Sequence, residues 1–179
     1  MLKIVVPKSE QFNSNDNTFV YIDETVLSLE HSLVSISKWE SKWHKPFISK
    51  EKKSTEETID YIKCMTLTQN VNPNVYYAIP NDLIEKIGDY IDNPMTATKF
   101  YDQNGKQSNE IITSEVIYYW MVTLGIPFEC QKWHLNRLLT LIRVCNEKNK
   151  PPKKLSKSEL YARNIRLNAQ RRKLLNSHG

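Results

Sequence analysis

The stretch SEVIYYWMVTL, residues 114–124, is the most informative part of this 179-residue sequence for predicting the fold. Apolar or aromatic residues occupy almost every side of the helix that it predicts, so that helix is buried in a core or against a partner. Gly125 then suits the end of the helix, and Pro127 suits the first turn of a second helix that continues to about Asn146. The sequence therefore predicts a helical hairpin in the body of the protein.

The beginning of the chain carries strand signals. Runs rich in β-branched and aromatic residues predict two or three short strands, at residues 2–6, 18–22 and, with a less clear alternation, 25–29. Residues 11–17 are polar turn formers, so we expect a small antiparallel β element with helices on one face. The predicted fold class is α+β and predominantly helical. Its single globular domain covers residues 1–147, with a β-rich part at 1–30 and a helical part at 35–147.

Three segments have the Ser-x-x-Glu spacing of a capping box, in which hydroxyl and carboxylate each accept a backbone N–H at a helix start. The segments are Ser37–Glu40, Ser54–Glu57 and Ser156–Glu159. Another short helix is expected with Asn81 as its cap, since apolar residues then follow a three-and-four spacing up to Asn93. Residues 102–110 predict a polar loop.

The net charge of +5 is distributed unevenly along the chain. Residues 148–179 hold ten lysines and arginines and one acid, giving +9, whereas residues 1–147 hold fifteen bases and nineteen acids, giving −4. The basic segment predicts a linker around Pro151-Pro152 and then a helix from Lys157 to about Asn176. Nucleic acid, an acidic protein surface or plain solubility would each suit this charge. The docking residues of the basic helix are predicted to be Arg163, Arg166, Arg171, Arg172 and Lys173.

The sequence excludes several classes of protein. No apolar run approaches the length of a membrane span of about 18 residues, and the N-terminal run is too short for a signal peptide, which predicts a cytoplasmic protein without a membrane partner. We expect no catalytic residues, no enzyme activity and no cofactor, because the chain shows no nucleophile–base pair, carboxylate pair or glycine-rich phosphate loop.

The cysteines and histidines predict no metal site. The three cysteines, Cys64, Cys130 and Cys145, are predicted to be free buried thiols. Cys130 and His134 are four residues apart on the predicted helix, but the two further ligands that a structural zinc site needs are missing.

Two groups of aromatic residues are candidates for a partner-binding surface, although packing in a core is their more common role. The candidates are Trp39, Trp43, Tyr118, Tyr119 and Trp120. An alternative is nucleic-acid binding by the basic helix together with a helix-turn-helix-like hairpin around Gly125–Pro127. The side chains that would read base edges in that case are Gln131, Lys132, His134, Asn136 and Arg137.

Most of the chain from about residue 30 onward also resembles a known family. The segments that carry the resemblance are SISKWESKW (35–43), YIKCMT (61–66), PMTAT (94–98), WHLNRLLTLIRVC (133–145) and the RN, LNA and RRK groups within 163–173. They are similar to small tail-module proteins of tailed bacteriophages. That group is labelled as tail assembly chaperones and is encoded near the tape measure protein.

The resemblance implies a non-enzymatic, multivalent binding protein of the host cytoplasm. Such a protein would keep the long helical tape measure protein soluble while the tail tube polymerises, and it needs exposed apolar or aromatic surface to do so. The resemblance brings no catalytic residues. Homo-oligomerisation and a structural role as a tail or connector component of the virion remain alternatives.

Overall fold

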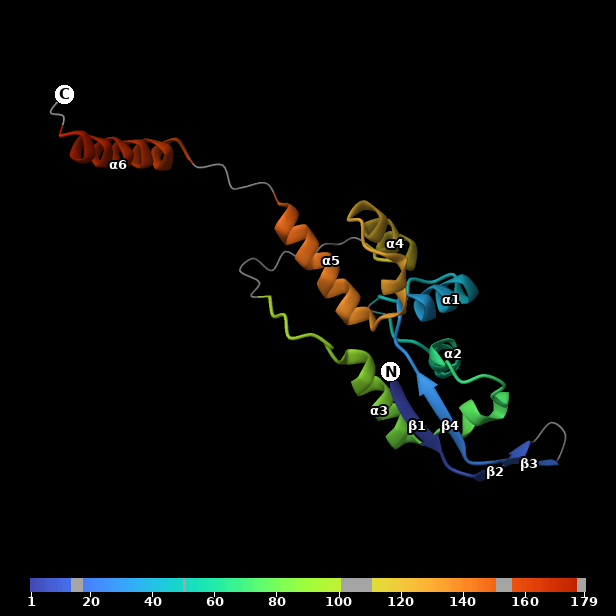
Figure 1. The fold of residues 1–179 in the computed structure, drawn as a ribbon. Helices are drawn as coiled ribbons and strands as arrows, with labels where there is room; N and C mark the ends of the chain where they lie inside the picture. Colours follow the sequence, from blue (N-terminus) through green and yellow to red (C-terminus); the bar gives the residue numbers. More distant parts are fainter. Residues whose placement is uncertain (14–17, 50, 101–110, 151–155, 177–179) are drawn as a thin grey trace. The chain divides into compact units, whose positions relative to one another are not determined.

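The computed structural model describes residues 1–13, 18–49, 51–100, 111–150 and 156–176 (Figure 1). The chain divides into two compact units, Met1–Asn146 and Glu147–Gly179. Antiparallel strands at the N-terminus precede a series of helices, so the predicted α+β, predominantly helical fold is confirmed.

The strands form an antiparallel ribbon that is interrupted at its middle. They are β1 (Leu2–Val6), β2 (Ser9–Asn13), β3 (Thr18–Ile22) and β4 (Thr25–Leu29). β1 pairs with β4, where Leu2 faces Leu29, and β2 pairs with β3, where Ser9 faces Ile22. In every facing pair of either half the two residue numbers sum to 31, as for Leu2 with Leu29 and Ser9 with Ile22. The two halves therefore have the same register. The three predicted strands are confirmed.

Strand β2 corrects the predicted turn at residues 11–17. Residues 11–13 lie in β2, whereas residues 14–17 lie outside the described part of the chain. The polar side chains of this segment favour a turn by local preference. Pairing with β3 supplies the backbone hydrogen bonds of a strand whatever those side chains are, and this pairing decides the outcome.

One face of the β1–β4 pair packs into the hydrophobic core. Ile4 and Val6 of β1 and Leu27 of β4 are buried, whereas Val5 and Val26 on the opposite face are exposed. This alternation is the period-two pattern of a strand with one buried face. Figure 1 shows α3 running beside β1, with α2 on the other side of the pair.

The helices follow in chain order. In the first unit they are α1 (Leu33–Trp43), α2 (Thr55–Met65), the 3-10 helix η1 (Pro73–Ala78), α3 (Asn81–Asp92), α4 (Ser114–Thr123), the 3-10 helix η2 (Phe128–Lys132) and α5 (Leu135–Asn149), which extends into the second unit. The second unit contains α6 (Lys157–Leu175). The predicted loop at 102–110 lies outside the described residues.

Two of the three predicted capping boxes are present. Ser54 caps α2 and Ser156 caps α6, and in each box the glutamate three residues later bonds back to the cap. In the α2 box Ser54 is exposed and Glu57 is buried. The Lys45 ammonium beside Glu57 lowers the pKa of the Glu57 carboxyl group. Asn81 does begin α3, but the cap position is Pro80 and makes no side-chain bond.

The predicted helix start at Ser37–Glu40 is wrong. α1 begins at Leu33, and the Ser32 hydroxyl oxygen accepts the Ser35 backbone N–H at 3.3 Å. The chain therefore enters the helix almost directly from β4. Glu40 consequently lies in the last turns of α1, and its carboxylate has a different role, described below.

The predicted single helix from Pro127 to about Asn146 is also wrong in its first half. Gly125 has the left-handed φ of 65° that was expected of a helix end. After Pro127, however, the chain forms η2 and breaks at Trp133 before α5 begins. The break occurs because the Leu135 backbone N–H donates to the carbonyl oxygen of His31 at 2.7 Å, which ties this point of the chain to the start of α1.

The cysteines are free thiols, but they are not equally buried. Cys130 in η2 is buried, as predicted, whereas Cys64 in α2 and Cys145 in α5 are only half-buried. Burial raises the pKa of the Cys64 thiol, with the nearby Asp60 carboxylate adding to the rise. Cys64 is therefore a weak nucleophile in this fold.

Candidate binding surfaces

Trp39 belongs to the core and not to a partner-binding surface, which corrects the sequence-based assignment. Its side chain is 1% exposed, and its indole N–H donates to the Glu57 carbonyl oxygen at 2.9 Å. The ring lies 6.2 Å from the Trp43 ring and 5.2 Å from the Phe47 ring. These contacts pack α1 against α2 and leave Trp39 no surface to offer to a partner.

Trp43 is half-buried at the edge of the same aromatic cluster. Its indole N–H donates to the Asp60 carboxylate at 3.0 Å, and Lys42 forms an ion pair with the same carboxylate. The ring therefore has a fixed position and is only partly exposed. Trp43 can contribute to a binding surface only with its exposed part.

The outward side of α4 carries two large exposed apolar side chains, together with the exposed polar residues Glu115 and Thr123. Ile117 and Met121 face the core and are fully buried, whereas Tyr119 and Val122 on the other side of the helix are 66% and 64% exposed. Large apolar side chains on the solvent side of a helix are typical of a partner-binding site when they are contiguous. The candidate Tyr119 is thus exposed on the surface.

A second aromatic residue extends this exposed area beyond the helix. Phe128 in η2 is 53% exposed, and its ring lies 6.4 Å from the ring of the half-buried Tyr118. The Tyr118 hydroxyl donates to Gln131 at 2.9 Å, which fixes the ring between the two elements. We call Tyr118, Tyr119, Val122 and Phe128 the α4 surface. Trp120, a half-buried residue that packs against the core, lies on another side of the helix.

Val122 and Phe128 are not among the sequence candidates. The sequence contains a signal for Val122, since residues 114–124 are apolar on almost every side of the helix and the core covers only some of these sides. Only the structure shows which sides those are. Phe128 joins the surface because Gly125 turns the chain back beside α4.

A groove between α2, η1 and α3 was not predicted. It has a volume of about 410 Å³, and its lining includes Ile59, Tyr76, Tyr77 and Ile84. The Lys63 ammonium lies 4.8 Å from the centre of the exposed Tyr77 ring. The groove is formed by three separate segments, so no single stretch of sequence carries its pattern.

A buried histidine pair joins several helices of the first unit. The rings of His31 and His134 lie 5.0 Å apart, and both residues are buried. His134 donates from Nε2 to the Tyr90 carbonyl oxygen at 2.9 Å and accepts the Asn136 backbone N–H at Nδ1. The Tyr61 hydroxyl lies 2.5 Å from Nδ1 of His31. The pair therefore joins α1, α2, α3 and α5 through its hydrogen bonds.

Both histidines are held in the neutral form. Burial lowers the pKa of His31 to about 3, with a further contribution from the neighbouring His134 ring. Burial also lowers the pKa of His134. Burial raises the pKa of Tyr61, so its hydroxyl stays protonated and is available to donate to the neutral His31 ring.

Acid should therefore destabilise the protein through His31. In the unfolded chain His31 has a pKa of about 6.5, so it binds a proton below that pH. In the folded protein its pKa is about 3, so it stays neutral until the pH is much lower. The unfolded state therefore binds more protons between these two values, and the folded state loses stability as the pH falls. We expect the free energy of unfolding to fall by about 2 kcal/mol through His31 when the pH is lowered from 7.5 to 5. Urea denaturation at both pH values should show a smaller loss for His31→Gln, and equal losses in variant and wild type would contradict the prediction.

Three of the five polar residues predicted to read base edges, Gln131, His134 and Asn136, are engaged inside the protein, whereas Lys132 and Arg137 are exposed. His134 is buried, and the Asn136 amide donates to the carbonyl oxygens of Ile91 and Asn93 at 2.9 Å each. Gln131 accepts the Tyr118 hydroxyl, and the Arg137 guanidinium stacks at 4.1 Å on the Trp133 ring. These contacts hold η2 and the start of α5 against α3 and α4.

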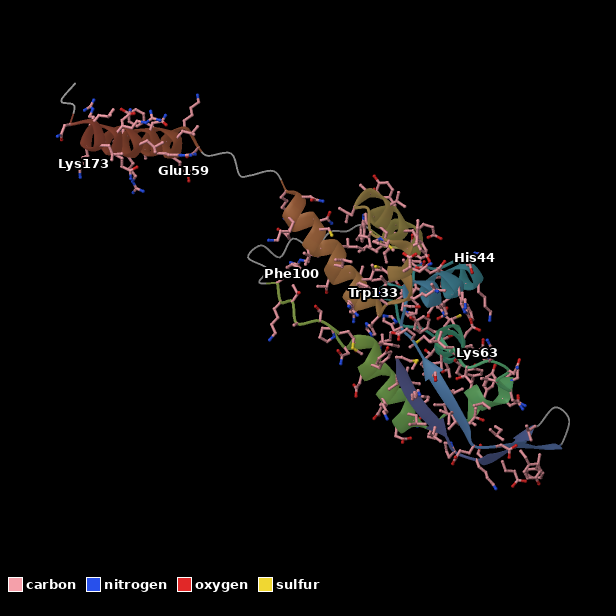
Figure 2. All side chains as sticks on the ribbon, viewed as in Figure 1. His44, Lys63, Phe100, Trp133, Glu159 and Lys173 are labelled. Carbon is pink, nitrogen blue, oxygen red and sulfur yellow. The ribbon has the colours of Figure 1, made fainter. Side chains whose placement is uncertain are left out.

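The predicted docking residues all lie on α6. Every residue from Ser156 to Asn176 is exposed, and Figure 2 shows side chains projecting all round the helix between Glu159 and Lys173. The basic residues Arg163, Arg166, Arg171, Arg172 and Lys173 are accompanied by exposed apolar side chains. The apolar residues are Leu160, Tyr161, Ile165, Leu167, Leu174 and Leu175.

Comparisons with protein-family models, with curated proteins and with solved structures found no match to this chain. Within the described ranges, no group of three or more histidine, cysteine or acidic side chains is arranged to hold a metal ion. Nor does any helix in the part of the chain that the structure describes have the length and hydropathy needed to cross a membrane.

Proposed function

We propose that this chain is a tail assembly chaperone of a tailed bacteriophage, and that it binds amphipathic helices of the tape measure protein through the α4 surface. Two lines of reasoning support the proposal. The sequence resembles small tail-module proteins of such phages in several segments. The α4 surface, independently, has the chemistry that an apolar helix requires of its binding protein.

The exposed face of α4 is the observation that carries the proposal. A surface helix normally has polar residues on its solvent side. In α4, the large side chains of Tyr119 and Val122 are exposed there beside the polar Glu115 and Thr123, and Phe128 extends the area next to Tyr118. Burying one such side chain against a partner contributes about 1.5–3 kcal/mol to the binding free energy. A few of them together therefore give a small surface useful affinity.

Co-expression with the tape measure protein of the same phage tests the proposal directly. We expect the tape measure protein to become more soluble and to elute with this chain as one complex in size-exclusion chromatography. If its solubility is unchanged and the two proteins elute separately, the proposal is wrong.

Two charges on the α4 surface should abolish this complex. In the variant Tyr119→Asp with Val122→Asp, both carboxylates would have to be desolvated in the interface, so we expect binding to weaken at least about a hundredfold. The control is Tyr21→Asp, which makes the same Tyr-to-Asp change once, at a 73% exposed tyrosine of β3, and should bind normally. Thermal denaturation should show that both variants remain folded.

The structural role in the virion is distinguished by a separate measurement. A chaperone acts before the tail is complete and leaves, whereas a tail or connector component remains. Mass spectrometry of purified particles should therefore detect the tape measure protein but not this chain. Detection of the chain in stoichiometric amount would favour the structural role.

A further inference from the structure

α6 carries a leucine repeat that is separate from the α4 surface. Leu160, Leu167 and Leu174 are spaced by seven residues, and their side chains are 44%, 38% and 84% exposed. A seven-residue repeat places them along one line of a helix, as at the d positions of a coiled coil. The a positions of the same repeat are then Lys157, Asn164 and Arg171.

We propose that α6 pairs with an acidic, leucine-bearing helix of another protein as a two-stranded coiled coil. The inference does not depend on the proposed chaperone function, because it concerns a different surface in the second unit of the chain. It assigns a ligand class to the basic helix: a helix with leucine at its d positions and carboxylates opposite the cations of α6.

The charge of α6 requires that the partner be acidic. Between Lys157 and Leu175 the helix has six bases and one acid, Glu159, so its net charge is +5. Two of the bases, Lys157 and Arg171, stand at the seam itself. A coiled coil can accept charged a positions when the facing residues have the opposite charge, and such residues also select the partner.

A second copy of the chain is a poor partner for the same reason. In a parallel pair, the Lys157 side chains of the two copies would face each other, and so would the two Arg171 side chains. In an antiparallel pair, Arg171 of each copy would face Leu160 of the other and be buried without an anion. Like charges at the seam therefore act against self-association.

The leucines also distinguish a helical partner from nucleic acid. Binding to phosphates uses arginine and lysine, and its strength depends on the number of charges and the salt concentration. Such binding leaves Leu160, Leu167 and Leu174 uncovered in water. Pairing with a helix buries these leucines and neutralises the seam cations at the same time, so it accounts for both features of α6.

The test measures binding of the full-length protein to a synthetic three-heptad peptide. The peptide has leucine at d, asparagine at the central a position, and glutamate at the other a positions and at e and g. We expect it to bind, whereas the same peptide with lysine in place of each glutamate should not. A short DNA duplex serves as the third probe.

A matched pair of variants locates the seam. Leu167→Asp and Ala169→Asp add the same charge to α6, but Leu167 is at a d position and Ala169 is on the opposite side of the helix. Leu167→Asp should weaken peptide binding by about tenfold or more, and Ala169→Asp by no more than about twofold. Arg171→Glu at the seam should likewise cost more than Arg166→Glu away from it.

Four outcomes would overturn the inference. Equal effects of the two Asp variants, or no binding of the acidic peptide, would exclude a leucine seam. Tighter binding of the duplex, falling steeply with salt and equally sensitive to Arg166→Glu and Arg171→Glu, would identify nucleic acid as the ligand. A dimer of the chain that Leu167→Asp dissociates would identify the second copy.

Discussion

Replacing Trp39 with alanine should lower the free energy of unfolding by about 4 kcal/mol, since truncating a buried Trp typically costs 3–5 kcal/mol. The indole is 1% exposed, and it fills the space between α1, α2 and Phe47. Its removal leaves a cavity and also leaves the Glu57 carbonyl oxygen without its indole donor. Urea denaturation at neutral pH measures the change.

Trp39→Phe is the matched control. It keeps an aromatic ring in the core but loses the hydrogen bond to Glu57, so we expect about half of the loss seen for alanine or less. A loss below about 1 kcal/mol for Trp39→Ala would show that the ring is not in the core. Any effect of Trp39→Ala on partner binding should disappear when binding is corrected for the fraction of folded protein.

Replacing Glu40 with alanine should cost about 3 kcal/mol, because two backbone N–H groups lose their acceptor at once. The Glu40 side chain is buried, and its carboxylate accepts the Phe47 N–H and the Ser114 N–H, each at 2.7 Å. Ser114 is the first residue of α4, whose cap residue Thr113 makes no side-chain bond. Glu40 therefore replaces the missing cap from 74 residues away.

Hydrogen exchange gives this prediction a local readout. Glu40→Ala should increase exchange of the backbone amides at the start of α4, while exchange in β1 and β4 stays slow at low denaturant. Glu40→Gln keeps one acceptor oxygen and should cost about half as much. Glu56→Ala, at an exposed position of α2, is the control and should be close to neutral. Unchanged exchange in α4 of the Glu40→Ala variant would contradict the capping role.

Glu40 also shows why local patterns mislead. Its spacing from Ser37 is that of a capping box, and the same spacing is correct at Ser54 and Ser156. The three segments are equivalent by spacing alone. They differ because the Ser32 hydroxyl already caps α1, and because the Glu40 carboxylate meets the start of α4 in three dimensions.

The candidate surface was predicted in part. The all-round apolarity of residues 114–124 predicts that α4 is buried in a core or against a partner, and the structure leaves the candidate Tyr119 exposed. The candidate Trp39 is buried, and the sequence could not distinguish the two, because periodicity gives a helix an apolar side without saying what covers it. For Trp39 the cover is α2 and Phe47, which are close in space through contacts that no short window of sequence contains.

The sequence by itself determined what depends on near neighbours in the chain: three of the four strands, the caps at Ser54 and Ser156, and the turn at Gly125. These features follow from backbone hydrogen bonds and steric limits within a few residues. The tertiary structure alone decided strand β2, the break before α5 and the burial of Trp39. The last two depend on hydrogen bonds or packing between distant segments, and strand β2 depends on pairing with the neighbouring strand β3, so in each case the deciding free energy exists only once these segments have come together.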